Sequence, residues 1–106
     1  MDHRVAMARV GGDAELLKEI ADLFLMESQK TMEELRSAIA ANHPEAVEHA
    51  AHALKGAVAN FGASATVAAA QRLEQMGRSG NLDGSAGALQ TLERFLSELC
   101  VELRAL

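Results

Sequence analysis

Hydrophobic residues recur every three or four positions along most of the chain, which is the spacing of an amphipathic helix. The pattern is clearest near the end, in a seam of leucines: Leu89, Leu92, Leu96, Leu99 and Leu103. A second seam runs through residues 14–41 and consists of Leu17, Ile20, Phe24, Thr31, Leu35 and Ala38. The two seams predict long core helices over about residues 84–105 and 14–41.

Two further leucines, Leu16 and Leu23, lie to one side of the second seam and widen it. A broad apolar face lets this helix touch both the core and a neighbouring segment. We therefore favour core packing for both leucines, with a docking surface for a partner as the alternative.

Residues that start and stop helices divide the chain into five segments. A short helix over about residues 2–10 ends at Gly11-Gly12, and Asp13 is suited to cap the helix that follows. Pro44 disfavours helix at His43 but suits the first position of a new helix, which should span about residues 44–61.

The helix of residues 44–61 is expected to end at Gly62, because glycine readily adopts the left-handed conformation of a C-cap. Ser64 is expected to cap the next helix, over about residues 65–78. The residues of that helix expected to face inward are Val67, Ala70, Leu73 and Met76. A loop at Ser79-Gly80-Asn81 then separates it from the last helix.

Short loops between successive long helices favour antiparallel neighbours. The expected fold is all-α, an antiparallel up-and-down four-helix bundle with an additional short N-terminal helix. The 106 residues fit one domain, residues 1–106, whose core needs no disulfide or metal. Alanine supplies much of the 49% hydrophobic content and three residues are aromatic, which suits closely packed helices.

Charge and cysteine content narrow the functional classes. A formal net charge of −5 without a basic run argues against nucleic acid and acidic membrane surfaces, because both attract clustered Lys and Arg. Cys100 is the one cysteine, and its place beside the leucine seam predicts a small buried thiol. The chain has neither a signal-peptide pattern nor a bilayer-spanning apolar run, so we expect a cytoplasmic protein. We also expect it to be a monomer.

Candidate chemistry concentrates in residues 52–63. The apolar stripe of the helix that carries them is Val47, Ala51, Leu54, Val58 and Phe61. At about 100° per residue, His52, Gly56 and Ala59 face roughly the opposite way. Gly56 costs the helix about 1 kcal/mol relative to alanine, and a larger side chain there would crowd His52. Lys55 can place its ammonium beside the ring, and an accessible histidine with a neighbouring cation predicts phosphoryl chemistry.

This stretch resembles the histidine-containing phosphotransfer family, whose signature is histidine, any residue, leucine, lysine and glycine, followed by a Gly-Ala pair. The matching residues are His52, Leu54, Lys55, Gly56, Gly62 and Ala63. The resemblance continues at residues 12–17, 73–74 and 77–78, so it spans most of the chain. It implies that His52 is phosphorylated, that Lys55 stabilises charge on the phosphate and that Gly56 keeps access open.

The same resemblance implies that a response-regulator receiver domain donates the phosphoryl group from its phospho-aspartate and that a second receiver accepts it. Ala59 and Asn60 are assigned to docking of these partners. The chain would be a carrier without a cofactor or ATP site of its own, and the receiver would supply Mg²⁺. Such domains occur alone or as the cytoplasmic C-terminal domain of a hybrid sensor kinase.

Three other classes remain open from the sequence. His49 and His52 share an outward face with Glu45 and Glu48 and could hold zinc, although metal sites in bundles usually converge from several helices. Five methionines would suit a haem-binding bundle, but the last helix offers no histidine ligand. A helical scaffold is the third class, and uptake of phosphate on His52 would separate a carrier from it.

Overall fold

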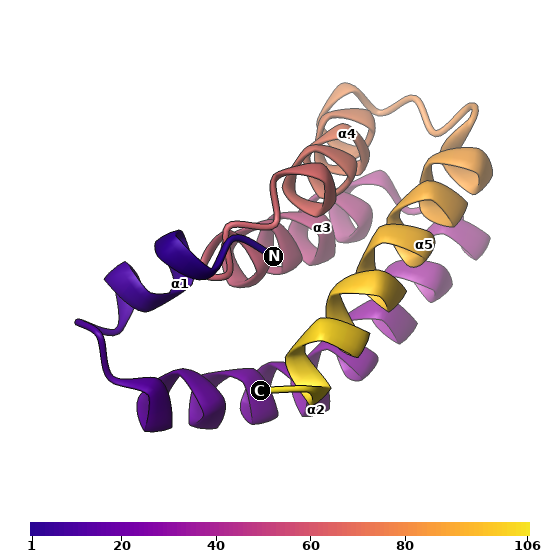
Figure 1. Ribbon diagram of the computed structural model, residues 1–106. Coiled ribbons are helices and arrows are strands. Elements are labelled where there is room, and N and C mark those ends of the chain that lie inside the picture. The colour runs from indigo at the N-terminus through magenta and orange to yellow at the C-terminus, as the bar shows by residue number, and fades with distance from the viewer.

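Five α-helices joined by short turns make up the computed structural model, which describes residues 1–106. Their bounds are α1 His3–Arg9, α2 Ala14–Ala40, α3 Pro44–Ala59, α4 Ser64–Ser79 and α5 Ser85–Arg104. Helices α2 to α5 form an up-and-down bundle in which each contacts its two neighbours, and α1 lies at one end (Figure 1). The predicted all-α bundle with a short N-terminal helix is confirmed.

The seams that predicted the helices form most of the core. In α5 the buried leucines are Leu92, Leu96, Leu99 and Leu103, and Leu89 is half-buried. In α2, Ile20 and Thr31 are half-buried, whereas the other members of the seam are buried. Phe24 of α2 meets Phe61 edge to face, with 5.3 Å between ring centroids, so α2 and the end of α3 are closely packed.

The core assignment for Leu16 and Leu23 is wrong. Both are exposed, Leu23 to 54%, and Met26 on the same helix is 74% exposed. The first half of α2 turns these side chains away from the bundle because Leu17, Ala21 and Phe24 already fill its inner face. An apolar strip on α2 is therefore left at the surface.

Two of the predicted helix starts are confirmed. The side chain of Asp13 accepts hydrogen bonds from the backbone N–H groups of Glu15 and Leu16 at the start of α2. Pro44 is the first residue of α3, and His43 caps that helix by accepting from the N–H of Ala46 through Nδ1. The capping role of His43 has no counterpart in the sequence prediction.

The turn between α3 and α4 differs from the prediction. Helix α3 ends at Ala59 with Asn60 as its C-cap, and Ser64 is already the first residue of α4, which has no side-chain cap. Gly62 has a φ of +62° within the turn, and a Cβ there would lie 2.7 Å from the Cβ of Asp2. Glycine is thus needed because α1 packs directly onto this turn.

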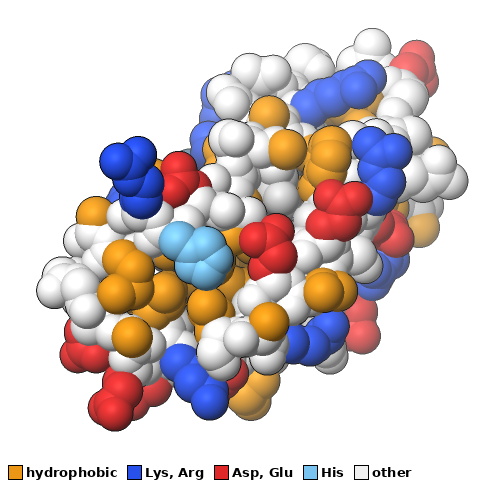
Figure 2. All heavy atoms as spheres, viewed as in Figure 1, with side chains coloured by type: hydrophobic (Ala, Val, Ile, Leu, Met, Phe, Trp, Pro, Cys, Tyr) orange, Lys and Arg blue, Asp and Glu red, His pale blue; other side chains and the backbone are white.

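The surface carries charges of both signs. On the face shown in Figure 2, basic and acidic side chains are interspersed, and apolar side chains gather toward the end of the bundle where α1 lies. None of the five helices combines the length and the apolar character needed to cross a bilayer.

Candidate functional site

His52 projects from the middle of α3, with 69% of its side chain exposed. The residues of the predicted inward stripe are all buried: Val47, Ala51, Leu54, Val58 and Phe61. Burial of this stripe fixes the rotation of α3 about its axis and thereby points His52 outward. The ring is therefore held on a rigid element and is open to a partner.

Glu74 of α4 reaches across to the same ring. Its Oε2 atom lies 2.5 Å from Nδ1 of His52, and its Oε1 atom accepts a hydrogen bond of 2.6 Å from Nζ of Lys55. Glu74 is only 2% exposed, and a buried carboxylate is costly unless its oxygens are paired. One buried carboxylate thus joins His52 and Lys55 in a single network.

Arg78 extends this network along α4. Its Nη2 atom lies 3.4 Å from Oε2 of Glu74, and its Nε donates to Oε2 of Glu48 at 2.8 Å. The two glutamates and the two cations, Lys55 and Arg78, balance in formal charge. The His52 ring therefore sits beside a group of charges that is neutral as a whole, with the anionic member closest to Nδ1.

The network determines which nitrogen of His52 is available. The hydrogen bond from Lys55 holds the pKa of the Glu74 carboxyl below its usual range, and the bond to His52 adds to this although burial opposes both. An ionised carboxylate can only accept hydrogen bonds, so Nδ1 of His52 must be the donor. In the neutral ring the lone pair is then on Nε2, which has no protein partner.

Gly77 allows α4 to approach α3 closely beside this network. A Cβ at Gly77 would lie 2.5 Å from the backbone nitrogen of Glu48 and 2.6 Å from the carbonyl oxygen of Pro44. Gly77 is buried and lies one turn after Glu74. The side chain of Glu74 reaches His52 because the backbones of α3 and α4 are in contact next to Gly77.

Gly56 has the opposite environment. A Cβ at this position would meet nothing within 4 Å, so no close helix packing requires glycine here. The open space lies one turn after His52, as expected for a position that keeps the ring accessible. Lys55 differs from the expectation, because its ammonium is bonded to Glu74 and its side chain is only 28% exposed.

Two grooves flank α3, and the two residues assigned to docking fall into different ones. Asn60 lines a groove of about 240 Å³ between α2 and α3, together with Leu23, Ala53 and Ala57. Ala59 lies in a shallower groove that α1, α3 and the start of α4 share. Ala53 directly follows His52, so the groove between α2 and α3 begins beside the candidate nucleophile.

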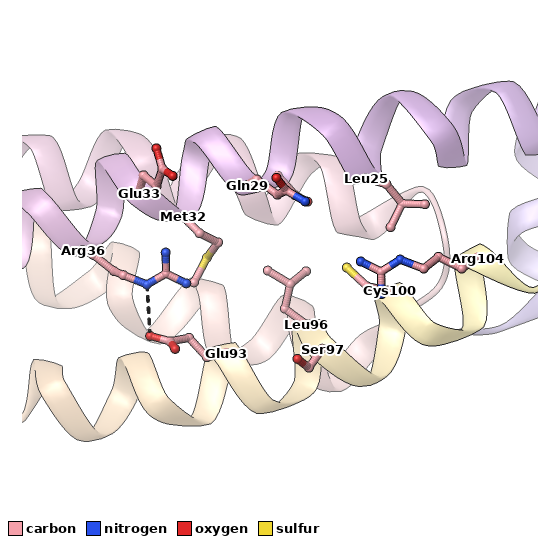
Figure 3. Close-up of a pocket in the computed structure, with 11 residues that line it drawn as sticks. Leu25, Gln29, Met32, Glu33, Arg36, Glu93, Leu96, Ser97, Cys100 and Arg104 are labelled. Atoms are coloured by element: carbon pink, nitrogen blue, oxygen red, sulfur yellow. Dashed lines mark hydrogen bonds and ion pairs between the residues drawn. The ribbon is translucent and has the colours of Figure 1, made fainter.

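A third groove lies between α2 and α5, and no residue of α3 or α4 lines it (Figure 3). Arg36 and Glu93 form an ion pair of 3.5 Å near one end, and Arg104 lies beside Cys100 near the other. Cys100 is half-buried, less than the full burial that we expected, and this burial raises the pKa of its thiol. This groove is separate from His52.

Glu74 falls within the resemblance, at residues 73–74, but it was not assigned a role in the site from the sequence. The feature of the sequence that could have indicated its role is the position of its carboxylate, one turn after Ala70 and directly after Leu73. Both of these residues are buried in α4. A charged residue at such a position is rarely buried without a partner, so the pattern calls for a cation or a histidine on the facing helix. Sequence alone does not reveal which facing residue that is.

Comparison with known proteins decides the family. Residues 19–103 match the family profile described as Hpt domain, which is most of the chain. The chain belongs to the Hpt family. It is a phosphohistidine carrier of two-component phosphorelays and not a kinase.

A solved structure supports the fold of this Hpt domain. Histidine-containing phosphotransfer protein B (HptB) from Pseudomonas aeruginosa PAO1 matches with a TM-score of 0.92 and 24% sequence identity. The match covers 99% of this chain and 91% of that one. A search of curated proteins finds no significant match.

The geometry also bears on the metal-site alternative. No group of three or more His, Cys, Asp or Glu side chains is arranged to hold a metal ion. Glu48 is engaged by Arg78, and His49 and Glu45 are exposed. The Hpt domain therefore brings His52 together with Glu74 and Lys55, and not with His49 and Glu45.

Proposed function

We propose that Nε2 of His52 accepts a phosphoryl group from the phospho-aspartate of a receiver domain and passes it to the aspartate of a second receiver. One observation carries this proposal: an exposed imidazole whose Nδ1 is bonded to a buried carboxylate. This bond orients the ring and leaves the Nε2 lone pair directed at solvent. Neutral imidazole is a competent nucleophile near neutral pH, so no separate base is required.

The direct test is to mix this domain with a phosphorylated receiver. Label that moves to the domain should be acid-labile and base-stable, as a phosphohistidine is. Peptide mapping should then locate the label on His52. Label found on another histidine, or on none, would contradict the proposal.

Lys55 is proposed to stabilise the phosphoryl group. Negative charge spreads over the equatorial oxygens of a phosphoryl group in flight, and a nearby ammonium lowers the energy of that state. In the structure Nζ of Lys55 donates a hydrogen bond to Oε1 of Glu74, while Oε2 of the same carboxylate faces the His52 ring. For this role the lysine side chain would exchange its contact with Glu74 for one with a phosphate on Nε2.

Replacing Lys55 with alanine should slow transfer about 10- to 100-fold without abolishing it, because a charge-assisted contact contributes about 1.5–3 kcal/mol and His52 remains. The measurement is a single-turnover rate with saturating receiver. Lys30→Ala, at an exposed position on α2, is the matched control and should leave the rate unchanged. Equal rates for the two variants would remove Lys55 from the transfer step.

The receiver is proposed to dock over the groove between α2 and α3. Its rim carries Leu23 and Asn60, and its floor contains apolar side chains of both helices. Leu23 lines this groove, and Leu16 and Met26 are further exposed apolar side chains on the same helix. An exposed apolar strip next to an open histidine fits a surface that a partner covers during transfer.

Replacing Leu23 with aspartate should weaken docking by about tenfold, since it places a charge where an apolar contact is expected. Transfer at limiting receiver should fall, and the rate at saturating receiver should change little. Val101→Asp is the control, because Val101 is 65% exposed on α5, away from the groove. A similar loss for both variants would argue against this docking face.

The remaining conditions of transfer are assigned to the partner. We propose that the receiver brings the Mg²⁺ ion that holds its phospho-aspartate, and that the domain acts in the cytoplasm, where receivers operate.

Ala59 is proposed to lie at the edge of the docked receiver, since it lies two turns after His52 on α3. Asn60 is proposed to contact the receiver from the groove itself.

A further inference from the structure

The contact between His52 and Glu74 has chemical consequences once the ring is phosphorylated. Oε2 of Glu74 faces Nδ1 at 2.5 Å, and the carboxylate is shielded from water. A charge-assisted hydrogen bond in such surroundings is stronger than one in water. The nearest charge to Nδ1 is therefore a fixed anion.

The proton on Nδ1 is retained when the ring accepts a phosphoryl group. The Nε2 lone pair forms the new P–N bond, the P–O bond of the phospho-aspartate breaks, and its electron pair leaves with the aspartate carboxylate. No proton is lost in this step, so the phosphorylated ring carries a positive charge. In onward transfer the P–N electrons return to Nε2 and regenerate a neutral ring.

Loss of the Nδ1 proton would change this outcome. A phosphorylated ring without that proton is neutral, and breaking its P–N bond would release an imidazolate anion, which is a poor leaving group. The phosphoryl group would then be retained for longer. The protonation of Nδ1 thus decides whether phosphorylated His52 is a good donor.

We propose that the Glu74 carboxylate holds the Nδ1 proton on phosphorylated His52 and thereby sets how readily the domain gives up its phosphoryl group. This inference rests on the proposed role of His52 as acceptor. Glu74 acts here through the ring and does not touch the phosphorus, so it is a positioning residue with an electrostatic effect.

The other charged groups around the ring modulate this effect. On α3 they are Lys55, which holds Oε1 of Glu74, and Glu48 and His49 in the preceding turn; on α4 the group is Arg78. Arg78 is shared between Glu74 and Glu48, at 3.4 Å and 2.8 Å respectively. A phosphoryl group on Nε2 would compete with Glu74 for Lys55 and Arg78. The Glu74 carboxylate would then be less neutralised by these cations and would interact more strongly with the positively charged ring.

The test uses the domain labelled with ¹⁵N-histidine and phosphorylated with phosphoramidate. Nδ1 is titrated by NMR in the wild type and in Glu74→Gln, which keeps an oxygen acceptor but removes the charge. The midpoint should fall by about one pH unit in the variant, a tenfold change in proton affinity. Above that midpoint, the phosphohistidine should decay more slowly and transfer to a receiver should be slower.

Two controls make the result decisive. Glu93→Gln removes one negative charge from the groove between α2 and α5, away from His52, and should leave the Nδ1 midpoint unchanged. The second control uses only the wild type and therefore does not depend on whether Glu74→Gln folds. The Nδ1 midpoint of the folded phosphorylated domain should lie above that of the same phosphorylated chain unfolded in urea. Equal midpoints in the folded and unfolded chains overturn the inference, whereas a domain that takes no label on His52 overturns the proposed function.

Discussion

His52→Gln is expected to abolish labelling by a phosphorylated receiver while changing the free energy of unfolding by less than about 0.5 kcal/mol. The ring is mostly exposed, so its removal takes little from the core. A glutamine amide at this position can still donate to Glu74, so the buried carboxylate keeps a partner. Labelling and urea denaturation, measured on one preparation, check both halves of the expectation.

His49→Gln is the matched control for this experiment, because His49 lies one turn earlier on α3 and is also exposed. It should retain transfer at the wild-type rate. The reverse behaviour of the two variants would move the acceptor to His49. A large loss of stability in His52→Gln would show that the ring supports the bundle.

Gly77→Ala is expected to destabilise the domain by about 1–3 kcal/mol and to slow transfer. The added Cβ would collide with backbone atoms of Pro44 and Glu48, and backbone cannot rotate away as a flexible side chain can. Helix α4 would have to move outward and take Glu74 from His52. Chemical denaturation and single-turnover transfer measure the two effects.

Gly56→Ala is the matched control, because both glycines lie inside helices and only Gly77 faces a neighbouring backbone. Alanine at position 56 should stabilise the helix by up to about 1 kcal/mol, since no atom lies within 4 Å of the new Cβ. Destabilisation by Gly56→Ala would contradict the open space seen beside His52. A neutral Gly77→Ala would contradict the tight approach of the two backbones.

Periodicity was sufficient to predict the bundle and the orientation of His52. Burial of an apolar stripe is a property of one helix, so the rotation of α3 follows from the spacing of Val47, Leu54 and Val58. The same reasoning failed for Leu23, because the width of an apolar stripe does not show how much of it the neighbouring helices cover. Burial at the edge of a stripe depends on the packing of other helices.

The network around His52 could be predicted only in part. Lys55 is one turn from His52 on the same helix, so its proximity follows from helical spacing. The contacts of Glu74 depend on the distance and the relative shift of α3 and α4, which Gly77 determines by packing against Pro44 and Glu48. A glycine in a sequence does not reveal whether it faces solvent or another backbone, as the contrast with Gly56 shows.

The single open ring beside the groove between α2 and α3 also constrains the kinetic order of the relay. If donor and acceptor receivers both dock over this groove, only one of them can occupy the domain at a time. Phosphoryl flow must then be a ping-pong process, in which the first receiver departs before the second binds. An excess of unphosphorylated acceptor would occupy the empty carrier and slow its loading, so the ratio of the two receivers would control the throughput of the relay.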